Sequence, residues 1–425
     1  MKILQIASGD FFSTYGGGQV YVKNIVDEML RQRRDIVVVS FVNGSAAVEK
    51  KEYKGIALYE VGSCAKGRLG EIIDEVRPDI IHAHSMEVTA CTEGSRRGIP
   101  VIITSHHGGI VCPAGTLFDM HDNICNTIFN HRNCLPCLLH NTRAGIYLYP
   151  FMRLMPCKWY LGLGRMLQRL PFIPFITPVG SSAVYIQNKQ RWWKTICSLC
   201  TCMIAPSDAM KTAMVRNGFD EKRIKILPHG IPMPSDVPSF PAVVDGCIKF
   251  FYVGRICYVK GLHVLLEAFH QVADRRIELH LIGGSRGRAE ERYERALRKR
   301  YRDDSRIFWH GKVAPNEVYG HISSLHVSSS SSYLEAFGLN IAESLAMGKP
   351  VLATRCGGAE MQIEDGCNGW LVPANDIEAM RAKIEEIIAA PERLAEMSKH
   401  CKAITIEQHC LSLMEIYENV NLLCR

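Results

Sequence analysis

The sequence has 425 residues, of which 47% are hydrophobic and 22% are charged, and its formal net charge is +7. This composition excludes a disordered or collagen-like chain, and the length allows two domains that each bury a core of their own. No run of about twenty uninterrupted apolar residues is present, so we expect no transmembrane helix.

The first residues, Met1–Ala7, are typical of a buried strand and show none of the regions of a secretory signal. In a chain of this length without such a signal, the 17 cysteines are expected to be reduced thiols or metal ligands. We therefore expect a cytoplasmic protein.

Strand-like and helix-like segments alternate through the first part of the chain. Strands are predicted at 2–7, 35–42, 79–84 and 100–104, and helices at 18–31 and 68–76. Because these strands are apolar throughout, we expect a parallel sheet that helices cover on both faces. Three glycines at 16–18 follow the first strand, which makes Gly17 and Gly18 candidates to approach a phosphate or an acceptor.

An insertion interrupts this alternation at about residues 112–196. Between Asn123 and Ser207 there is no Asp or Glu, whereas nine Arg and Lys residues are present. One interpretation is a hydrophobic insertion that packs on the N-terminal domain. Aromatic residues such as Tyr147, Tyr149, Trp192 and Trp193, and the apolar run at 170–176, favour a segment on an anionic membrane surface. The protein would then be peripheral on the inner face of the cell membrane. No nucleic-acid recognition module accompanies the basic residues, so nucleic acid is not an expected partner.

Four cysteines of the insertion offer soft metal ligands: Cys112, Cys125, Cys134 and Cys137. A tetrahedral zinc ion bound to them would stabilise this irregular loop, and such a site would be structural. Unliganded thiols account for the same residues equally well, so both interpretations stay open. A catalytic metal is not expected.

The alternation resumes at 202–205 and becomes more regular after a proline-rich segment at 228–245, which suits an interdomain linker. Further strands are predicted at 224–227, 248–253, 277–282, 306–309, 325–328 and 350–354, and helices at 207–217, 261–273, 289–301, 316–323, 338–347, 376–390 and 404–423. Asp303 and Asp304 are expected to form a solvated turn. The predicted domains are an N-terminal domain at 1–230, a linker at 231–246 and a second domain at 247–403. A C-terminal helix at 404–425 is a candidate to cross back to the first domain.

Two carboxylates, Glu335 and Glu343, stand on either side of a predicted loop-to-helix junction. The backbone N–H groups of Phe337, Gly338 and Leu339 would point out of the helix start, where hydrogen bonding and the helix dipole favour an anionic diphosphate. Because carboxylates repel phosphate, Glu343 is expected to bind ribose hydroxyls and Glu335 the hydroxyls of a transferred sugar. The alternative is that both are solvated surface carboxylates.

Two cations, Arg255 and Lys260, follow the predicted strand 248–253 at the carboxyl edge of the second sheet. A guanidinium and an ammonium in this place can neutralise the charge that develops on a departing diphosphate. Taken alone, they would be ordinary surface charges.

Taken together and in this order, these segments resemble glycosyltransferase family 4, whose members are retaining, metal-independent enzymes of the GT-B architecture. The resemblance covers nearly the whole chain, with matches at 16–18, 77–84, 205–207, 227–231, 254–261, 335–343, 357–360 and 368–372. It implies an α/β fold in which two Rossmann-like, doubly wound domains face a central cleft.

The resemblance also implies roles for single residues. Glu343 would bind the ribose of the donor, Glu335 its sugar, and Arg255 with Lys260 its diphosphate. His106 matches the family's histidine near the reacting centre.

The sequence departs from the family's pattern at three places. Ala336 stands where Gly is frequent, His229 stands where Asn is frequent, and His107 doubles the histidine. The choice between His106 and His107 therefore stays open.

The function that follows is a retaining hexosyltransferase. It would move a sugar from a UDP- or GDP-linked donor to a glycan or lipid-linked acceptor in the synthesis of surface polysaccharide or glycoconjugate. The departing phosphate can take the proton of the attacking hydroxyl, so neither a catalytic cofactor nor a dedicated protein base is expected. The alternatives are a sugar-nucleotide epimerase of the same fold and a non-catalytic binding protein docked to a membrane.

Overall fold

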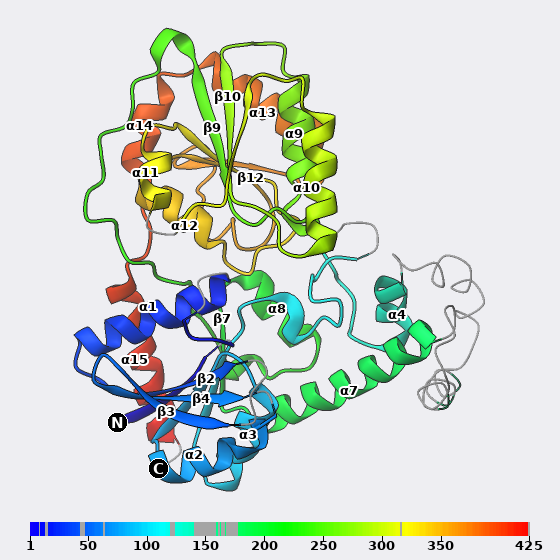
Figure 1. The fold of residues 1–425 in the computed structure, drawn as a ribbon, viewed down its shortest axis with the longest axis vertical. Coiled ribbons are helices and arrows are strands. Elements are labelled where there is room, and N and C mark those ends of the chain that lie inside the picture. The colour runs from blue at the N-terminus through cyan, green and yellow to red at the C-terminus, as the bar shows by residue number, and fades with distance from the viewer. Residues whose placement is uncertain are drawn as a thin grey trace. The chain divides into compact units, whose positions relative to one another are not determined.

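The computed structural model describes residues 1–7, 9–12, 16–42, 47–62, 64–119, 124–139, 159, 162, 166, 177–314 and 317–423. The chain forms two compact units. The first combines Met1–Leu227 with Cys410–Arg425, and the second is Pro228–His409. In each unit a twisted sheet is surrounded by helices (Figure 1).

The sheet of the first unit has the strand order β3-β4-β2-β1-β5-β6-β7-β8. Its strands are β1 (Lys2–Ile6), β2 (Asp35–Val42), β3 (Val48–Tyr53), β4 (Ile56–Gly62), β5 (Ile80–Ala83), β6 (Val101–Thr104), β7 (Cys202–Ala205) and β8 (Ile224–Ile226). Neighbouring strands pair in parallel except β3 and β4, which form an antiparallel hairpin at the edge. The strand order reverses at β1. Open parallel sheets bind ligands at such a reversal, outside the carboxyl ends of the strands.

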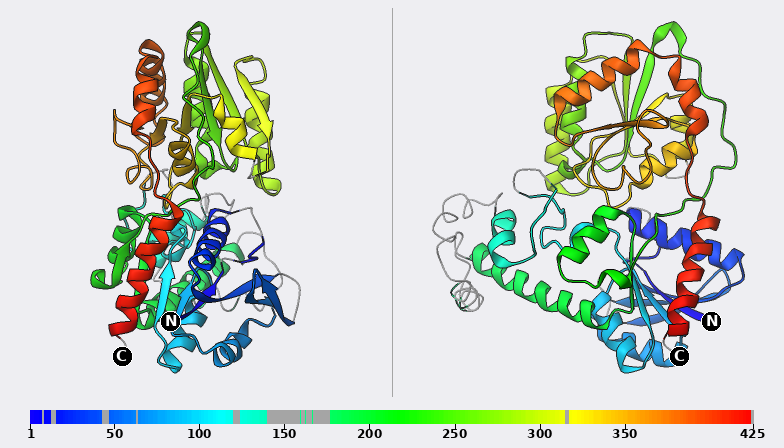
Figure 2. Two further views of the ribbon diagram at one scale, coloured as in Figure 1. Left: turned by 90° about the vertical axis from the view of Figure 1, so that its left-hand side faces the viewer. Right: turned by 180° about the vertical axis from the view of Figure 1, so that it is seen from behind.

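The final helix of the chain completes the core of the first unit. The helices described in this unit are α1 (Gly17–Arg31), α2 (Leu69–Val76), α3 (Glu87–Arg96), α4 (His131–Leu139), α7 (Thr177–Leu199), α8 (Asp208–Arg216) and the part of α15 (Ile406–Leu423) that follows residue 409. Tyr21, Ile25 and Met29 of α1 are fully buried. In Figure 2, α15 is drawn in red and lies beside α1, where the Cys410 thiol is 3.9 Å from the Ile25 carbonyl oxygen.

The second unit is built on a parallel sheet with the strand order β11-β10-β9-β12-β13-β14. Its strands are β9 (Ile248–Val253), β10 (Ile277–Ile282), β11 (Ile307–Gly311), β12 (Val327–Ser330), β13 (Val351–Thr354) and β14 (Gly369–Val372). Its described helices are α9 (Leu262–Gln271), α10 (Arg288–Arg300), α11 (Val318–Ser323), α12 (Leu339–Ala346), α13 (Ile377–Ala389) and α14 (Arg393–His400). Phe250 and Tyr252 of β9 pack with Leu265 and Phe269 of α9 in a large apolar cluster. Its strand order reverses between β9 and β12.

The predicted strands 248–253 and 277–282 coincide with β9 and β10 residue for residue. The pattern of apolar residues in the sequence predicts neither the hairpin of β3 and β4 nor α3, β14 and α14. β3 has the sequence Val-Glu-Lys-Lys-Glu-Tyr, and its four central side chains are exposed. A charged edge strand of this kind lacks the apolar pattern on which the prediction rests.

The expectation of a solvated turn is wrong for Asp304. Its side chain is 1% exposed and accepts hydrogen bonds from the Arg306 guanidinium at 2.7 and 2.8 Å. His270 Nδ1 lies 2.8 Å from the same carboxylate. The hydrogen bonds from Arg306 hold the pKa of the Asp304 carboxyl far below its usual range. The pair therefore belongs to the interior, at the start of β11.

Two helices within the predicted insertion, α4 and α7, are among the described residues. α7 packs on α3 and α4, and its residues Ala183, Ile186 and Trp193 are buried. The indole N–H of Trp193 donates to the Asn217 carbonyl oxygen at 2.8 Å. This helix therefore packs on the N-terminal unit through one of its faces. Trp192, the residue before Trp193 on the same helix, is exposed. Tyr147, Tyr149 and the run at 170–176 lie outside the described residues.

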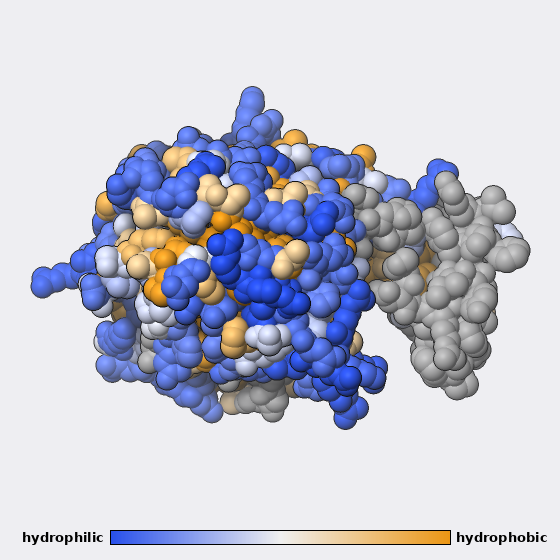
Figure 3. Space-filling view, turned by 90° about the horizontal axis from the view of Figure 1, so that it is seen from above, coloured by the Kyte–Doolittle hydropathy of each residue, from blue (hydrophilic) through white to orange (hydrophobic). Residues whose placement is uncertain are grey.

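Among the described residues, no helix has the length and apolar character needed to cross a membrane. Figure 3 shows one face of the molecule, which is hydrophilic over most of its area and carries apolar residues in smaller patches. Peripheral association with a membrane stays a prediction.

Candidate active site

The candidate donor site lies at the carboxyl edge of the second sheet. β9 and β12 are neighbours in the middle of that sheet, and each is followed by a loop that carries predicted site residues. Arg255 and Lys260 follow β9, and Glu335 and Gly338 follow β12. Because the strand order reverses between these two strands, their carboxyl ends mark the place where a ligand binds in sheets of this type.

Glu335 and Lys260 are in direct contact. Oε1 of Glu335 accepts hydrogen bonds from the Lys260 ammonium and, at 2.7 Å, from the Ser332 hydroxyl. The Glu335 N–H donates to the Cys356 carbonyl oxygen at 3.0 Å, which fixes the backbone as well. The side chains of Glu335 and Lys260 are 11% and 24% exposed. The loops after β9 and β12 are thus joined by a partly desolvated ion pair.

α12 begins beside this ion pair. Its N-cap is Gly338, whose φ of 90° lies in the left-handed region that favours glycine. The first N–H groups of a helix have no acceptor within the helix, so those of Gly338 and Leu339 are oriented to bind an anion. Phe337, which precedes them, is buried with its ring 5.2 Å from that of His229.

Gln362, which the sequence analysis does not identify, holds the loop before α12. Its Nε2 donates to the Phe337 carbonyl oxygen at 2.6 Å and lies 3.3 Å from the carbonyl oxygens of Gly338 and Gly358. A Cβ atom at Gly358 would be 2.4 Å from the Phe337 carbonyl oxygen, so only glycine fits there. The glycines at 357–358 signal such a close approach, but nothing in the sequence marks Gln362 as its partner.

Arg255 lies at the same edge as Lys260 and is half-exposed. Its Nε is 3.6 Å from Oε1 of Glu290 on α10, which balances part of its charge. The Arg255 carbonyl oxygen accepts a hydrogen bond from the Tyr252 hydroxyl at 2.7 Å, which ties the loop to β9. The structure therefore brings both predicted cations to the end of one strand.

Glu343 lies on α12, the helix that begins at this site. Burial raises the pKa of its carboxyl group to about 7. Burial raises the pKa of the Tyr319 hydroxyl on α11, and the negative charge of Glu343 adds to that rise. Near neutral pH the group is therefore divided between its neutral and ionised forms.

In the first unit, His106 and His107 follow β6 in different surroundings. His107 Nδ1 accepts a hydrogen bond from the Gly109 N–H at 2.9 Å and so caps the turn that follows. His106 Nε2 lies 2.9 Å from Nδ1 of His84. A Cβ atom at Gly18 would be 3.2 Å from the His106 ring. The structure therefore places His106, and not His107, against the start of α1.

Gly17 and Gly18 are the first two residues of α1, and Gly16 is its N-cap. His106 is enclosed between this helix and the sheet, and burial lowers the pKa of its imidazole to about 3. The histidine is neutral at physiological pH as a result.

Three cysteines of the predicted zinc site lie in the surroundings of the fourth, Cys134. Burial raises the pKa of the Cys134 thiol to about 12, and Cys112, Cys125 and Cys137 are close enough to add to that rise. Within the described residues, however, no group of three or more His, Cys, Asp or Glu side chains is placed to hold a metal ion. Structural zinc and unliganded thiols both stay predictions.

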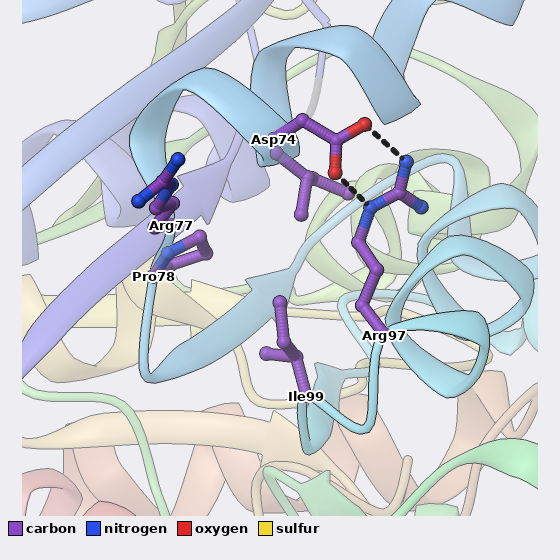
Figure 4. Close-up of a pocket in the computed structure, with 6 residues that line it drawn as sticks. Asp74, Arg77, Pro78, Arg97 and Ile99 are labelled. Atoms are coloured by element: carbon purple, nitrogen blue, oxygen red, sulfur yellow. Dashed lines mark hydrogen bonds and ion pairs between the residues drawn. The ribbon is translucent and has the colours of Figure 1, made fainter.

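A pocket of about 390 Å³ lies at the opposite, amino edge of the first sheet (Figure 4). Its lining residues are Ile73, Asp74, Arg77, Pro78, Arg97 and Ile99. Arg97 is already paired with Asp74 through two hydrogen bonds of 2.6 and 2.7 Å, and the two groups face each other in Figure 4. Because parallel sheets bind ligands at the carboxyl edge, we do not assign this pocket to the site.

Two family models match the chain. The family described as "Glycosyl transferases group 1" matches residues 241–403, and "Glycosyltransferase Family 4" matches residues 15–122. The first range contains the candidate donor site, and the second contains the start of α1 and His106.

Curated relatives include two D-inositol 3-phosphate glycosyltransferases. The one from Xylanimonas cellulosilytica is 29% identical over 224 residues, which are 47% of this chain and 53% of that protein. The one from Rhodococcus erythropolis is 27% identical over 228 residues, 50% of this chain and 52% of that protein. The chain spans about half the length of these relatives.

Solved structures resemble the whole chain. Anabaena HepE in complex with UDP and glucose has a TM-score of 0.66 at 16% identity and covers 98% of this chain and 99% of its own. Sucrose-phosphate synthase from Thermosynechococcus elongatus has a TM-score of 0.68 at 18% identity and covers 99% of both chains. These similarities, together with the two parallel sheets, confirm the predicted α/β fold of the GT-B type.

Proposed function

This chain belongs to the family 4 glycosyltransferases, as its sequence predicts, and we propose that it moves a hexose from a UDP- or GDP-linked donor to a hydroxyl group of an acceptor. The contact between Lys260 and Glu335 beside the start of α12 carries this proposal. It joins a cation, a helix N-terminus and a carboxylate at one edge of a sheet. These are the groups that bind a diphosphate and a sugar rich in hydroxyls.

In the proposed reaction, the bond between the anomeric carbon and the phosphate oxygen breaks. The acceptor oxygen bonds to the same carbon on the same face, and its proton passes to the departing phosphate oxygen, so the configuration is retained. Lys260 and Arg255 stabilise the charge on that diphosphate. The Lys260 ammonium has three N–H donors and can serve the phosphate while it keeps its bond to Glu335.

The remaining roles follow from position. Glu335 would accept hydrogen bonds from hydroxyl groups of the donor sugar, and Glu343 would accept hydrogen bonds from the ribose hydroxyls. The backbone N–H groups from Phe337 to Leu339 would bind the diphosphate. Binding of UDP and glucose by HepE supports a UDP-linked hexose as the donor. We propose a glycan or a lipid-linked sugar as the acceptor, and the names of the curated relatives add inositol phosphate as a candidate. His106 would lie on the acceptor side, in the first unit.

The direct test of the site is Glu335→Gln. We expect a loss of transfer of at least about a hundredfold, because the neutral amide binds neither Lys260 nor the sugar hydroxyls as strongly. The matched control is Glu267→Gln, which also removes a carboxylate from an ion pair, with Arg300, but on α9. Sugar transfer measured by mass spectrometry, with circular dichroism to verify the fold, compares them. Unchanged turnover in the folded Glu335→Gln protein would remove this residue from the site.

The same assay separates the alternative functions. The wild-type protein is incubated with UDP- and GDP-sugars, first alone and then with lipid-linked oligosaccharide or inositol phosphate. A glycosylated acceptor supports the proposal. An isomerised nucleotide sugar formed without any acceptor would instead indicate an epimerase, and neither product would indicate a binding protein.

A further inference from the structure

A series of hydrogen bonds runs through the core of the first unit from Thr104 to His106 by way of α15. It joins Thr104, His82, Tyr417, Gln5, His84 and His106, which we call the buried relay. The successive donor–acceptor distances are 2.7, 2.6, 3.0, 3.0 and 2.9 Å. Gln5, His82 and Thr104 lie on β1, β5 and β6, His84 and His106 follow β5 and β6, and Tyr417 lies on α15.

The buried relay is an exception in an otherwise apolar interior. Gln5, His82 and Tyr417 have no exposed surface, while their strand neighbours Ile3 and Ile81 are apolar and fully buried. Burying polar groups is costly unless each one is hydrogen-bonded, and the loss of one partner leaves the next group unsatisfied. An apolar side chain would pack at these positions without that cost. These buried polar groups therefore point to a role beyond packing, at the end of the relay where His106 lies.

The orientation of the Gln5 amide decides where the protons of the relay lie. Gln5 Nε2 lies 3.0 Å from the Tyr417 hydroxyl oxygen and 3.8 Å from the Met29 sulfur. A thioether sulfur only accepts hydrogen bonds, so the amide nitrogen, and not the amide oxygen, faces this side. The Gln5 oxygen then faces His84 and accepts from its Nε2–H at 3.0 Å.

At the other end of the relay, the Tyr417 hydroxyl, which accepts from Gln5, lies 2.6 Å from His82 Nδ1. His82 Nε2 lies 2.7 Å from the Thr104 hydroxyl oxygen, and Thr104 is also hydrogen-bonded to Tyr21. His84 is therefore the histidine whose proton the Gln5 amide fixes, on Nε2. Burial disfavours a second proton on its ring, because the residue is 4% exposed.

The consequence at His106 follows directly. His84 carries its proton on Nε2, so its Nδ1 is an acceptor, and His106 must donate Nε2–H to it across 2.9 Å. The proton of His106 is then on Nε2, and its Nδ1 is left with a lone pair. The ring cannot turn away from His84 freely, because it lies against Gly18 on one side and Tyr21, at 5.1 Å between ring centroids, on another.

We propose that Tyr417 is a positioning residue which, through Gln5 and His84, holds His106 as the neutral Nε2–H tautomer with Nδ1 as an acceptor. An imidazole in this state accepts a hydrogen bond from a hydroxyl group and cannot donate one from Nδ1 to a phosphate oxygen. The effect of this tautomer on sugar transfer rests on the proposed function, whereas the tautomer itself does not.

The tautomer is tested by ¹⁵N nuclear magnetic resonance of the protein labelled at histidine, for the wild type and Tyr417→Phe. In the wild type we expect a protonated Nε2 and an unprotonated Nδ1 at His106. Tyr417→Phe removes the nearer and stronger of the two acceptors that orient the Gln5 amide and leaves only the weakly accepting Met29 sulfur, so the amide can turn over and both tautomers of His106 should then be populated. The control Tyr59→Phe removes a partly buried tyrosine hydroxyl that donates to Glu75 in the same unit, and it should leave His106 unchanged. An Nδ1–H tautomer in the wild type, or the same single tautomer in Tyr417→Phe, would overturn the proposal.

Should Tyr417→Phe fail to fold, Gln5→Leu provides the second variant, since leucine suits the apolar surroundings and breaks the relay at its centre. The same mixture of tautomers is expected. In the transfer assay, both variants should lower kcat about tenfold and leave KM for the nucleotide sugar within about twofold, because the donor diphosphate binds to the second unit. A fall in stability with unchanged kcat would reduce the relay to a structural role. If the wild type transfers no sugar at all, the proposed function fails while the tautomer experiment still stands.

Discussion

Glu343 shows how one buried carboxyl group links stability to pH. Its burial on α12 raises its pKa from the ordinary value of 4.5 to about 7. The folded protein therefore holds this proton more tightly than the unfolded chain. The contribution of the group to stability is greatest below about pH 4.5 and is lost as the pH rises through about 7.

We expect Glu343→Gln to stabilise the protein at pH 8 and to change its stability little at pH 4, because the amide keeps the shape of the side chain but does not ionise. The gain in the free energy of unfolding at pH 8 should be about 1–3 kcal/mol. Urea unfolding at the two pH values measures it. The control Glu267→Gln should act in the opposite direction at pH 8, because a hydrogen bond from Tyr301 lowers the pKa of Glu267. An equal effect of Glu343→Gln at both pH values would contradict the raised pKa.

The sequence indicates the polar residues of the donor site better than it indicates the contacts among them. Arg255, Lys260 and Glu335 belong to motifs, and the structure brings them to the ends of β9 and β12. The direct bond between Lys260 and Glu335 joins residues 75 positions apart, and no local pattern encodes it. Gln362 is missed for the same reason, because its three carbonyl partners become neighbours only when the loops fold together.

At the scale of single elements, a buried ion pair directly precedes β11, and the apolar pattern of the sequence does not predict it. The guanidinium of Arg306 is enclosed by the Asp304 carboxylate and by two carbonyl oxygens of the chain that follows α9. Removing one partner of such a pair strongly destabilises the folded protein, because the remaining charge stays buried.

Asp304→Asn is therefore expected to lower the free energy of unfolding by about 3–5 kcal/mol. The neighbouring substitution Asp303→Asn is the control, since the Asp303 side chain is 87% exposed and its change should stay within about 0.5 kcal/mol. Chemical unfolding at pH 7 compares the two proteins. Because the pKa of Asp304 is lowered, its stabilising contribution should be present above pH 4 and fall as the pH drops further. Equal stability of the two variants would show that Asp304 is not paired in the interior.

Elements are predictable from the sequence where burial dictates their composition. β9 has apolar residues on both faces, β10 alternates buried apolar residues with polar ones, and the predicted bounds of both strands are correct. β14 has only four residues and follows a loop rich in polar side chains, so it offers too short a pattern. α3 contains Gly94, whose Cβ would be 2.4 Å from Val101. Packing of this helix on β6 thus selects a glycine that lowers its helical propensity, and the prediction fails there.

At the scale of the whole molecule, the chain divides into two units, and its last helix returns to the first one. Tyr417 reaches Gln5 across 412 positions of sequence. The tautomer proposed for His106 therefore depends on the end of the chain, which no inspection of the segment around β6 could reveal. The donor site, by contrast, is assembled within the second unit alone, from the loops after β9 and β12.

The most direct test of this account is a crystal structure of the protein with a bound UDP- or GDP-sugar. We predict that the diphosphate oxygens lie within hydrogen-bonding distance of the Gly338 and Leu339 N–H groups and of the Lys260 ammonium, with the ribose at Glu343. A diphosphate bound elsewhere on the second unit, with Lys260 and Glu335 paired but without contact to the nucleotide, would contradict it.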